Sequence, residues 1–138
     1  MPRKLTRIGL VPIEDVLPFV PLKFKDLKSR VKSLDEHRTY HGFSVRISSH
    51  RLICFAIYGT KCAHCGMEGR YFAVERSVED GCHLNLYALG EDGDEILMTR
   101  DHVTPKSKGG TDAASNAQTL CSPCNAKKAD EVAGTSEG

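Results

Sequence analysis

The 138-residue chain contains no tryptophan, and phenylalanine and tyrosine together make up only 7% of it. It also lacks an apolar run near the ~20 residues that a membrane-spanning helix requires. The N-terminal stretch MPRKLTRIGLVPIEDV is basic but has no apolar segment of signal-peptide length. We therefore expect a cytoplasmic protein without a membrane partner, whose small core would gain from a metal ion that links its parts.

Six cysteines are present, and four of them form two Cys-x-x-Cys pairs, Cys62 with Cys65 and Cys121 with Cys124. Disulfides are the alternative in a secreted protein, but two such pairs without an export signal favour tetrahedral zinc. Four thiolates would close the coordination shell, which is typical of a structural zinc ion. His64 lies inside the first pair and is a less favoured ligand. Cys54 and Cys82 lie in apolar segments and are interpreted as free thiols.

The net charge of +1 hides an asymmetry along the chain. Residues 1–51 carry eleven Lys/Arg and five Asp/Glu, whereas residues 52–138 carry eight and thirteen. An amphipathic basic helix is expected over residues 23–34. Such a helix suits either phosphate contacts or simple packing with solvated lysines, and its basic residues include Lys25, Lys28, Arg30 and Lys32.

The remaining pattern predicts a mixed α and β chain. Serines and Gly59 bound a helix over residues 48–58, and a second helix is expected over 123–132 after Ser122 and Pro123. Residues 105–120 are expected to form a loop. Strands are expected over 70–75, 83–89 and 95–103, the last two forming a hairpin.

Asp101 and His102 end the third expected strand. Adjacent side chains on a strand point to opposite faces, so both cannot enter one core unless the strand ends there. A neutral imidazole can take a proton from water, and a carboxylate can hold a hard divalent cation. Phosphodiester cleavage uses both groups.

The run DHVTPKSKGG, then Asn116, then CSPCNAKK resembles the HNH endonuclease family over roughly residues 50–131. The resemblance implies an α+β fold with a ββα-metal (His-Me finger) core, stapled by the four-cysteine zinc and carrying an inserted β-hairpin. It further implies three segments: a basic N-terminal extension over 1–47 that contacts DNA or packs, a nuclease domain over 48–132, and a flexible tail over 133–138. Small nucleases of phages and mobile elements have this size.

The resemblance also implies roles for individual residues. His102 would be the general base, and Asp101 a ligand of one catalytic Mg²⁺ or Mn²⁺. Asn116 would hold the loop and help to orient the histidine. Asn125 stands where the family often has histidine and would be the second ligand, which makes this chain an H-N-N variant. A neutral amide oxygen suits Mg²⁺ or Mn²⁺ better than zinc.

Basic residues around the motif are candidate DNA contacts, namely Arg100, Lys106, Lys108, Lys127 and Lys128. The predicted function is a metal-dependent endonuclease, monomeric or homodimeric, that cuts or nicks DNA, most simply a duplex. The alternative is a non-catalytic zinc-stabilised module that binds nucleic acid.

Overall fold

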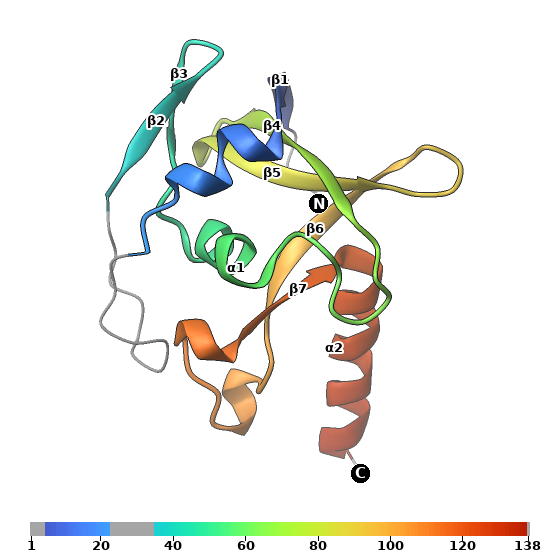
Figure 1. Ribbon diagram of the computed structural model, residues 1–138. Coiled ribbons are helices and arrows are strands. Elements are labelled where there is room, and N and C mark those ends of the chain that lie inside the picture. The colour runs from blue at the N-terminus through green and yellow to red at the C-terminus, as the bar shows by residue number, and fades with distance from the viewer. Residues whose placement is uncertain (1–4, 23–34, 138) are drawn as a thin grey trace.

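The structure, a computed structural model, describes residues 5–22 and 35–137, although for 130–137 it describes the helix and not the side chains. The chain folds as a small mixed α/β unit around a five-stranded antiparallel sheet in the order β1–β4–β5–β6–β7 (Figure 1). The strands are β1 (Thr6–Val11), β4 (Gly69–Ser77), β5 (Gly81–Leu89), β6 (Glu95–His102) and β7 (Ala117–Cys121). No helix in these ranges is long and apolar enough to cross a membrane.

The three strands predicted over residues 70–75, 83–89 and 95–103 are present in the structure. β4, β5 and β6 overlap the three expected strands, and β5 pairs with β6 in the register Tyr87 with Leu97 and Leu89 with Glu95. The alternation of apolar and polar residues in these segments carried the prediction, because each strand packs one face on the core.

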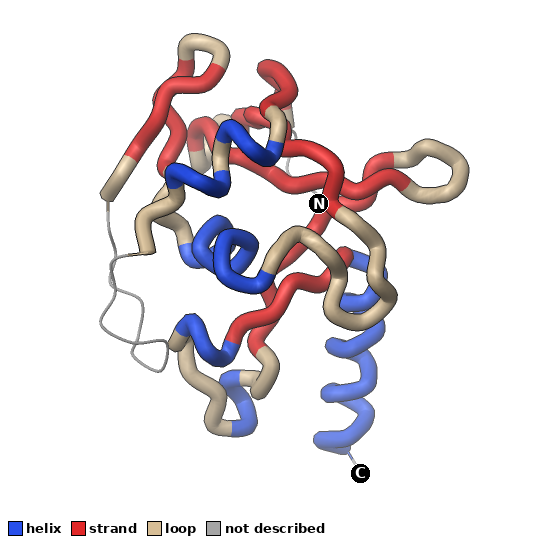
Figure 2. The backbone as a smooth tube through the Cα atoms, viewed as in Figure 1, coloured by secondary structure: helices blue, strands red, loops and turns tan. Residues whose placement is uncertain are grey.

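Helix α1 (His50–Tyr58) confirms the first predicted helix. The Ser49 side chain accepts a hydrogen bond from the Leu52 amide at 3.2 Å, and Gly59 ends the helix with φ of 92°. α1 buries Leu52, Ile53, Cys54 and Phe55 near the centre of the molecule, whereas α2 extends away at one side (Figure 2). The capping residues therefore set the helix, and its apolar face anchors the core.

Residues before α1 form part of the same core. β1 pairs with β4, and two short 3-10 turns follow it at Ile13–Asp15 and Leu17–Phe19. Val11, Val16 and Val20 are buried in the core cluster. The described part of the N-terminal extension is therefore packed on the sheet, while its boundary at residue 47 stays a prediction.

A second, two-stranded sheet was not predicted. β2 (His37–Tyr40) and β3 (Phe43–Arg46) form a hairpin whose turn residues His41 and Gly42 have φ of 51° and 83°. Two positive φ angles are typical of a type I′ turn, which Asn-Gly signals better than His-Gly. The His41 Nε2 atom lies 2.7 Å from the Leu10 carbonyl, so the turn packs on β1.

The prediction of a continuous loop over residues 105–120 was wrong at its end. β7 pairs with β6, with Met98 opposite Cys121 and His102 opposite Ala117. Apolar and polar residues do not alternate clearly along β7, because helices contact both of its faces. On one face the Thr119 hydroxyl lies 3.8 Å from the Cys54 thiol of α1. On the other face the β6–β7 pair contacts α2.

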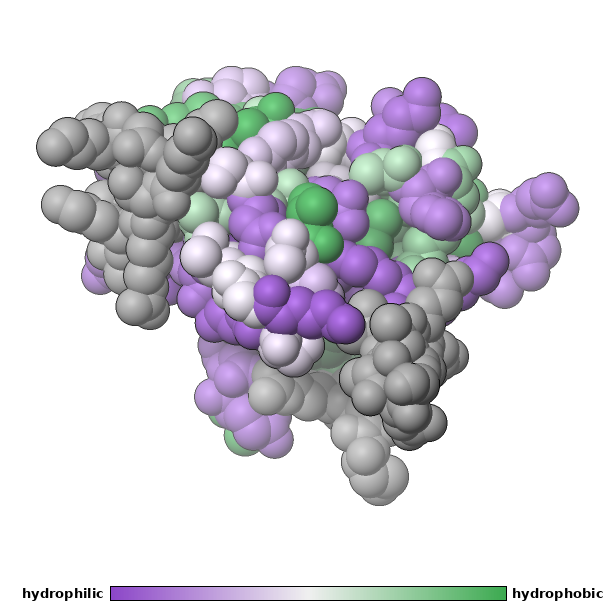
Figure 3. Space-filling model, turned by 90° about the horizontal axis from the view of Figure 1, so that it is seen from below, coloured by the Kyte–Doolittle hydropathy of each residue, from purple (hydrophilic) through white to green (hydrophobic). Residues whose placement is uncertain are grey.

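Helix α2 (Ser122–Glu137) begins where it was expected and continues past the predicted end at residue 132. Among the coloured residues of the side seen in Figure 3, hydrophilic ones predominate in the lower part and hydrophobic ones lie among those above. The basic helix predicted over residues 23–34, with Lys25, Lys28, Arg30 and Lys32, falls outside the described residues.

Candidate active site and metal centre

Four cysteines meet between the Cys62–Cys65 turn and the junction of β7 with α2. The thiol sulfurs of Cys62, Cys65, Cys121 and Cys124 all lie within 4.8 Å of one another. The turn is docked on β7 by a 2.8 Å hydrogen bond from the Ala63 amide to the Thr119 carbonyl. These distances fit a single metal site with four cysteine ligands. Cys54 and Cys82 lie outside this cluster and are free cysteines.

The electrostatics of the cluster show why it suits a cation. Burial opposes ionisation of Cys62, but backbone amides of Cys65, Cys121 and His64 outweigh it and lower the thiol pKa to about 6. Contact with the Cys121 thiol, together with burial, raises the pKa of Cys124 to about 12. Like charges packed this closely cannot all form without a cation. The cluster can therefore hold a metal such as zinc, which would displace protons on binding.

Asp101 faces α2 from the end of β6. Its Oδ2 atom accepts from the side-chain amide (Nε2) of Gln118 at 2.9 Å, across the β6–β7 pair, and from the Lys128 ammonium at 2.5 Å. The same Lys128 nitrogen lies 2.5 Å from the His102 carbonyl oxygen. The carboxylate that was predicted to hold a divalent cation is thus held by an amide and an ammonium group.

His102 is directed to a different partner. Its Nε2 atom lies 3.0 Å from Oδ1 of Asp112, whose other oxygen lies 2.8 Å from the Lys106 ammonium. Lys106, followed by His102, holds the pKa of Asp112 well below its ordinary range. Asp112 was missed by the sequence analysis, and the available signal was only a carboxylate in the same loop as Lys106.

Asn116 closes the loop between β6 and β7. Its side-chain oxygen accepts from the Thr104 amide at 2.8 Å, and its Nδ2 donates to the carbonyls of Thr104 and Thr111 at 3.0 and 2.8 Å. The Val103 amide donates to the Asn116 carbonyl at 3.0 Å. A side chain that bonds both ends of a loop in this way restricts the loop next to His102.

Asn125 lies in the first turn of α2 and is oriented by Thr99. The Thr99 hydroxyl donates its one proton to the Leu120 carbonyl at 2.8 Å, so it must accept from Asn125, whose Nδ2 lies 2.8 Å away. This assigns the amide orientation and turns the Asn125 oxygen away from Thr99. That oxygen is then available to a ligand.

Asp101, His102 and Asn125 line one open cavity of about 420 Å³. Its remaining lining residues are Pro105, Lys106, Lys128 and Ala129. One carboxylate and one amide oxygen are donors that Mg²⁺ and Mn²⁺ prefer, so the residues fit such an ion. The side chains were predicted from positions 24 residues apart, and β6 and α2 bring them to the same hollow.

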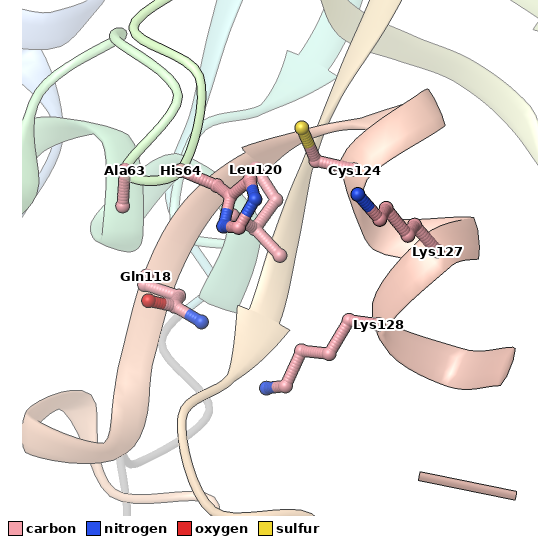
Figure 4. Close-up of a pocket in the computed structure, with 7 residues that line it drawn as sticks. All are labelled: Ala63, His64, Gln118, Leu120, Cys124, Lys127 and Lys128. Atoms are coloured by element: carbon pink, nitrogen blue, oxygen red, sulfur yellow. The ribbon is translucent and has the colours of Figure 1, made fainter. Parts of the chain in front are cut away.

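A second hollow of about 270 Å³ lies beside the cysteine turn and shares Lys128 with the first. Figure 4 shows Lys127 projecting near Cys124, Lys128 reaching from α2 towards β6, and the His64 ring beside Leu120. Of the predicted DNA contacts, Lys106 and Lys128 therefore reach the first hollow and Lys127 the second. Arg100 lies on β6, and Lys108 ends the 3-10 turn Lys106–Lys108.

In a comparison with protein families, residues 90–137 match the model described as HNH endonuclease. This segment contains β6, the loop, β7 and α2, and hence all four residues of the predicted catalytic set. Comparisons with curated proteins and with solved structures found no match.

Proposed function

We propose that this chain, whose residues 90–137 belong to the HNH endonuclease family, is a divalent-metal-dependent endonuclease that hydrolyses phosphodiester bonds of DNA. Family membership supports nuclease activity in general. The observation that carries the finer proposal is the cavity shared by Asp101, His102 and Asn125, in which the Asn125 oxygen is left free by Thr99.

In this proposal β6, β7 and α2 form the ββα-metal core, and the β4–β5 hairpin is the insertion between the first cysteine pair and that core. Asp101 and Asn125 would hold one Mg²⁺ or Mn²⁺. When bound, such an ion stabilises the negative charge that develops on the phosphate and on the leaving oxygen. Lys128 would then release Asp101 and be free for a phosphate oxygen.

His102 is proposed as the general base. Asp112 is a carboxylate and can only accept, so the facing Nε2 atom of His102 carries the proton and Nδ1 carries a lone pair. That lone pair would take a proton from water for in-line attack on the scissile phosphate, which would leave 5′-phosphate and 3′-hydroxyl ends. Asn116 would keep the loop, and with it the imidazole, in place.

The four cysteines are proposed to bind one zinc ion that performs no chemistry. Their role would be to join the Cys62–Cys65 turn to the start of α2 and so fix Asn125 relative to β6. The basic residues of the motif and of the N-terminal segment would contact the phosphates of duplex DNA, so binding should weaken with salt. A cytoplasmic location and a monomeric or dimeric state stay predictions.

The test is a plasmid-cleavage assay with Mg²⁺ or Mn²⁺, in which His102→Ala and Asp101→Asn are compared with wild type. We expect conversion of supercoiled DNA to nicked or linear forms that stops in EDTA and is slowed by at least roughly 100-fold in both variants. His83→Ala, on β5, is the matched control and should cut as wild type does. Equal cleavage by wild type and His102→Ala would contradict the proposal, because it would indicate a contaminating nuclease.

One observation favours the alternative of a non-catalytic nucleic-acid-binding module. The Asp101 carboxylate is already neutralised by Lys128, as it would be in a site that never receives a divalent cation. The alternative predicts DNA binding that does not require Mg²⁺ or Mn²⁺, with no cleavage whether or not these ions are present.

A further inference from the structure

The Nε2 atom of His102 meets the carboxylate of Asp112, which the proposed chemistry does not itself require. Asp112 uses both oxygens, one towards His102 at 3.0 Å and one towards Lys106 at 2.8 Å. The side chain of Asp112 is 21% exposed and that of His102 is 27% exposed. Both side chains are thus partly exposed, and what holds their geometry is the bonding of the loop rather than burial.

The loop around Asp112 is held on both sides. Asn116 donates to the Thr111 carbonyl at 2.8 Å, and the Ala113 amide donates to the Thr111 hydroxyl at 3.3 Å. From α1, the Tyr58 hydroxyl donates to the Ala114 carbonyl at 2.7 Å. The residues on either side of Asp112 are thus tied to the loop and to the helical core.

Gly110 allows the loop to close tightly enough for this arrangement. Its amide donates to the Pro105 carbonyl at 2.9 Å, and a Cβ atom built on it would lie 1.8 Å from the Thr104 carbonyl oxygen. Such a close backbone approach is open only to glycine. It brings Asp112 back towards the strand end from which the loop departs.

We propose that Asp112 is a positioning residue for His102: it accepts the Nε2 proton, fixes the ring, and directs the Nδ1 lone pair towards the attacking water. This inference rests on the proposed nuclease function and deepens it. A base that is itself oriented by a third group is a recurring arrangement in hydrolytic sites. Asp112 does not touch the substrate, so it acts only through His102, and Lys106 keeps its second oxygen engaged.

The kinetic test compares Asp112→Ala with wild type on a labelled duplex. We expect kcat to fall roughly 10- to 100-fold with little change in KM, because partners of this kind typically contribute that much and the whole base contributes roughly 10²- to 10⁴-fold. Lys106→Met, which leaves the His102 contact, should lower kcat less. Asp92→Ala, in the exposed turn between β5 and β6, is the matched control and should cut normally. Unchanged kcat in a folded Asp112→Ala would overturn the proposal.

A double-mutant comparison separates positioning from a purely structural role. In the His102→Ala background, Asp112→Ala should cause no further loss, because the group through which it acts is absent. A further loss of the same size as in wild type would show that Asp112 acts independently of His102 and would refute the inference.

An NMR measurement on the metal-free protein does not depend on nuclease activity. The Nε2 proton of His102, assigned by its absence in His102→Ala, should appear as a hydrogen-bonded resonance and be lost in Asp112→Ala. Persistence of that resonance in Asp112→Ala would overturn the inference even if the protein cuts DNA. If wild type does not cut but the resonance behaves as expected, the proposed function fails while the Asp112–His102 contact stands.

Discussion

The ammonium group of Lys128 contacts the carboxylate of Asp101, with Nζ 2.5 Å from Oδ2, and so joins α2 to the end of β6. The same nitrogen contacts the His102 carbonyl. The Val103 carbonyl oxygen, 3.3 Å away, is a third oxygen atom next to the Lys128 nitrogen. A group of oxygen atoms also suits a metal cation. Lys128 and a divalent cation would compete for Asp101.

Replacing Lys128 by methionine should strengthen divalent-metal binding in the absence of DNA. Unit charges this close interact by several kcal/mol at most, and partial exposure of the Lys128 side chain reduces that figure, so we expect a gain of roughly tenfold in affinity. Mn²⁺ titration followed by electron paramagnetic resonance measures it. Lys127→Met is the matched control, and unchanged or weaker binding by Lys128→Met would show that there is no competition.

Thr99 should influence metal affinity without contacting the metal. Thr99→Val removes the acceptor that orients the Asn125 amide, at a cost of about 1 kcal/mol, so Mn²⁺ affinity should fall several-fold. Thr99→Ser retains the hydroxyl and should bind like wild type. Valine keeps the branched shape of threonine, whereas serine does not. If only side-chain packing on β6 matters, Thr99→Val should therefore bind Mn²⁺ like wild type and Thr99→Ser should bind it more weakly, which would contradict the prediction.

Removal of one cysteine of the cluster should release a bound metal. We expect Cys124→Ser to lose its zinc, measured by elemental analysis, and to melt at least about 10 °C lower, because structural zinc contributes several kcal/mol. Cys82→Ser, outside the cluster, should retain both. Zinc affinity should also fall as the pH is lowered, because Cys124, with its pKa raised to about 12, must lose a proton to coordinate. A Cys124→Ser protein with full zinc content would exclude this site.

The loop glycines should differ sharply in their tolerance of alanine. Gly109 has a φ of 87° with nothing within 4 Å of an added Cβ, so Gly109→Ala should cost only about 1–2 kcal/mol of unfolding free energy. Gly110→Ala would place Cβ against the Thr104 backbone and should cost roughly 3 kcal/mol or more, or displace the loop. Urea unfolding of both variants gives the comparison, and equal costs would mean that the loop yields easily.

Tyr87 gives a pH dependence at the opposite end of the sheet. Burial, together with its hydrogen bond to Glu75, raises the pKa of Tyr87 from the ordinary value of 10.0 to about 12. Its contribution to stability is therefore present below pH 10 and is lost as the pH rises from 10 to 12. The unfolding free energy of Tyr87→Phe should decline less steeply over this range, and identical slopes would contradict the assigned shift.

Short-range features could be predicted from the chain alone because their causes are local. Ser49 and Gly59 delimit α1 through hydrogen bonds and dihedral angles of their own neighbours, and alternation identified β4, β5 and β6. The Cys-x-x-Cys pairs likewise indicated which thiols would meet. β7 could not be identified in this way, because α1 and α2 bury it from both sides and erase the alternation.

The partners of the catalytic candidates depended on the tertiary structure. The chemistry of a carboxylate beside an imidazole singled out Asp101 and His102, and the resemblance to the HNH endonuclease family, which depends on residue types and their order, added Asn125. Nothing in the order of residues joins Asp112 to His102 or Lys128 to Asp101. Those pairs form because the loop that closes at Gly110 and the helix that follows β7 both bring polar side chains back to the end of β6. There Asp112 and Lys128 lie close enough to His102 and Asp101 to form hydrogen bonds.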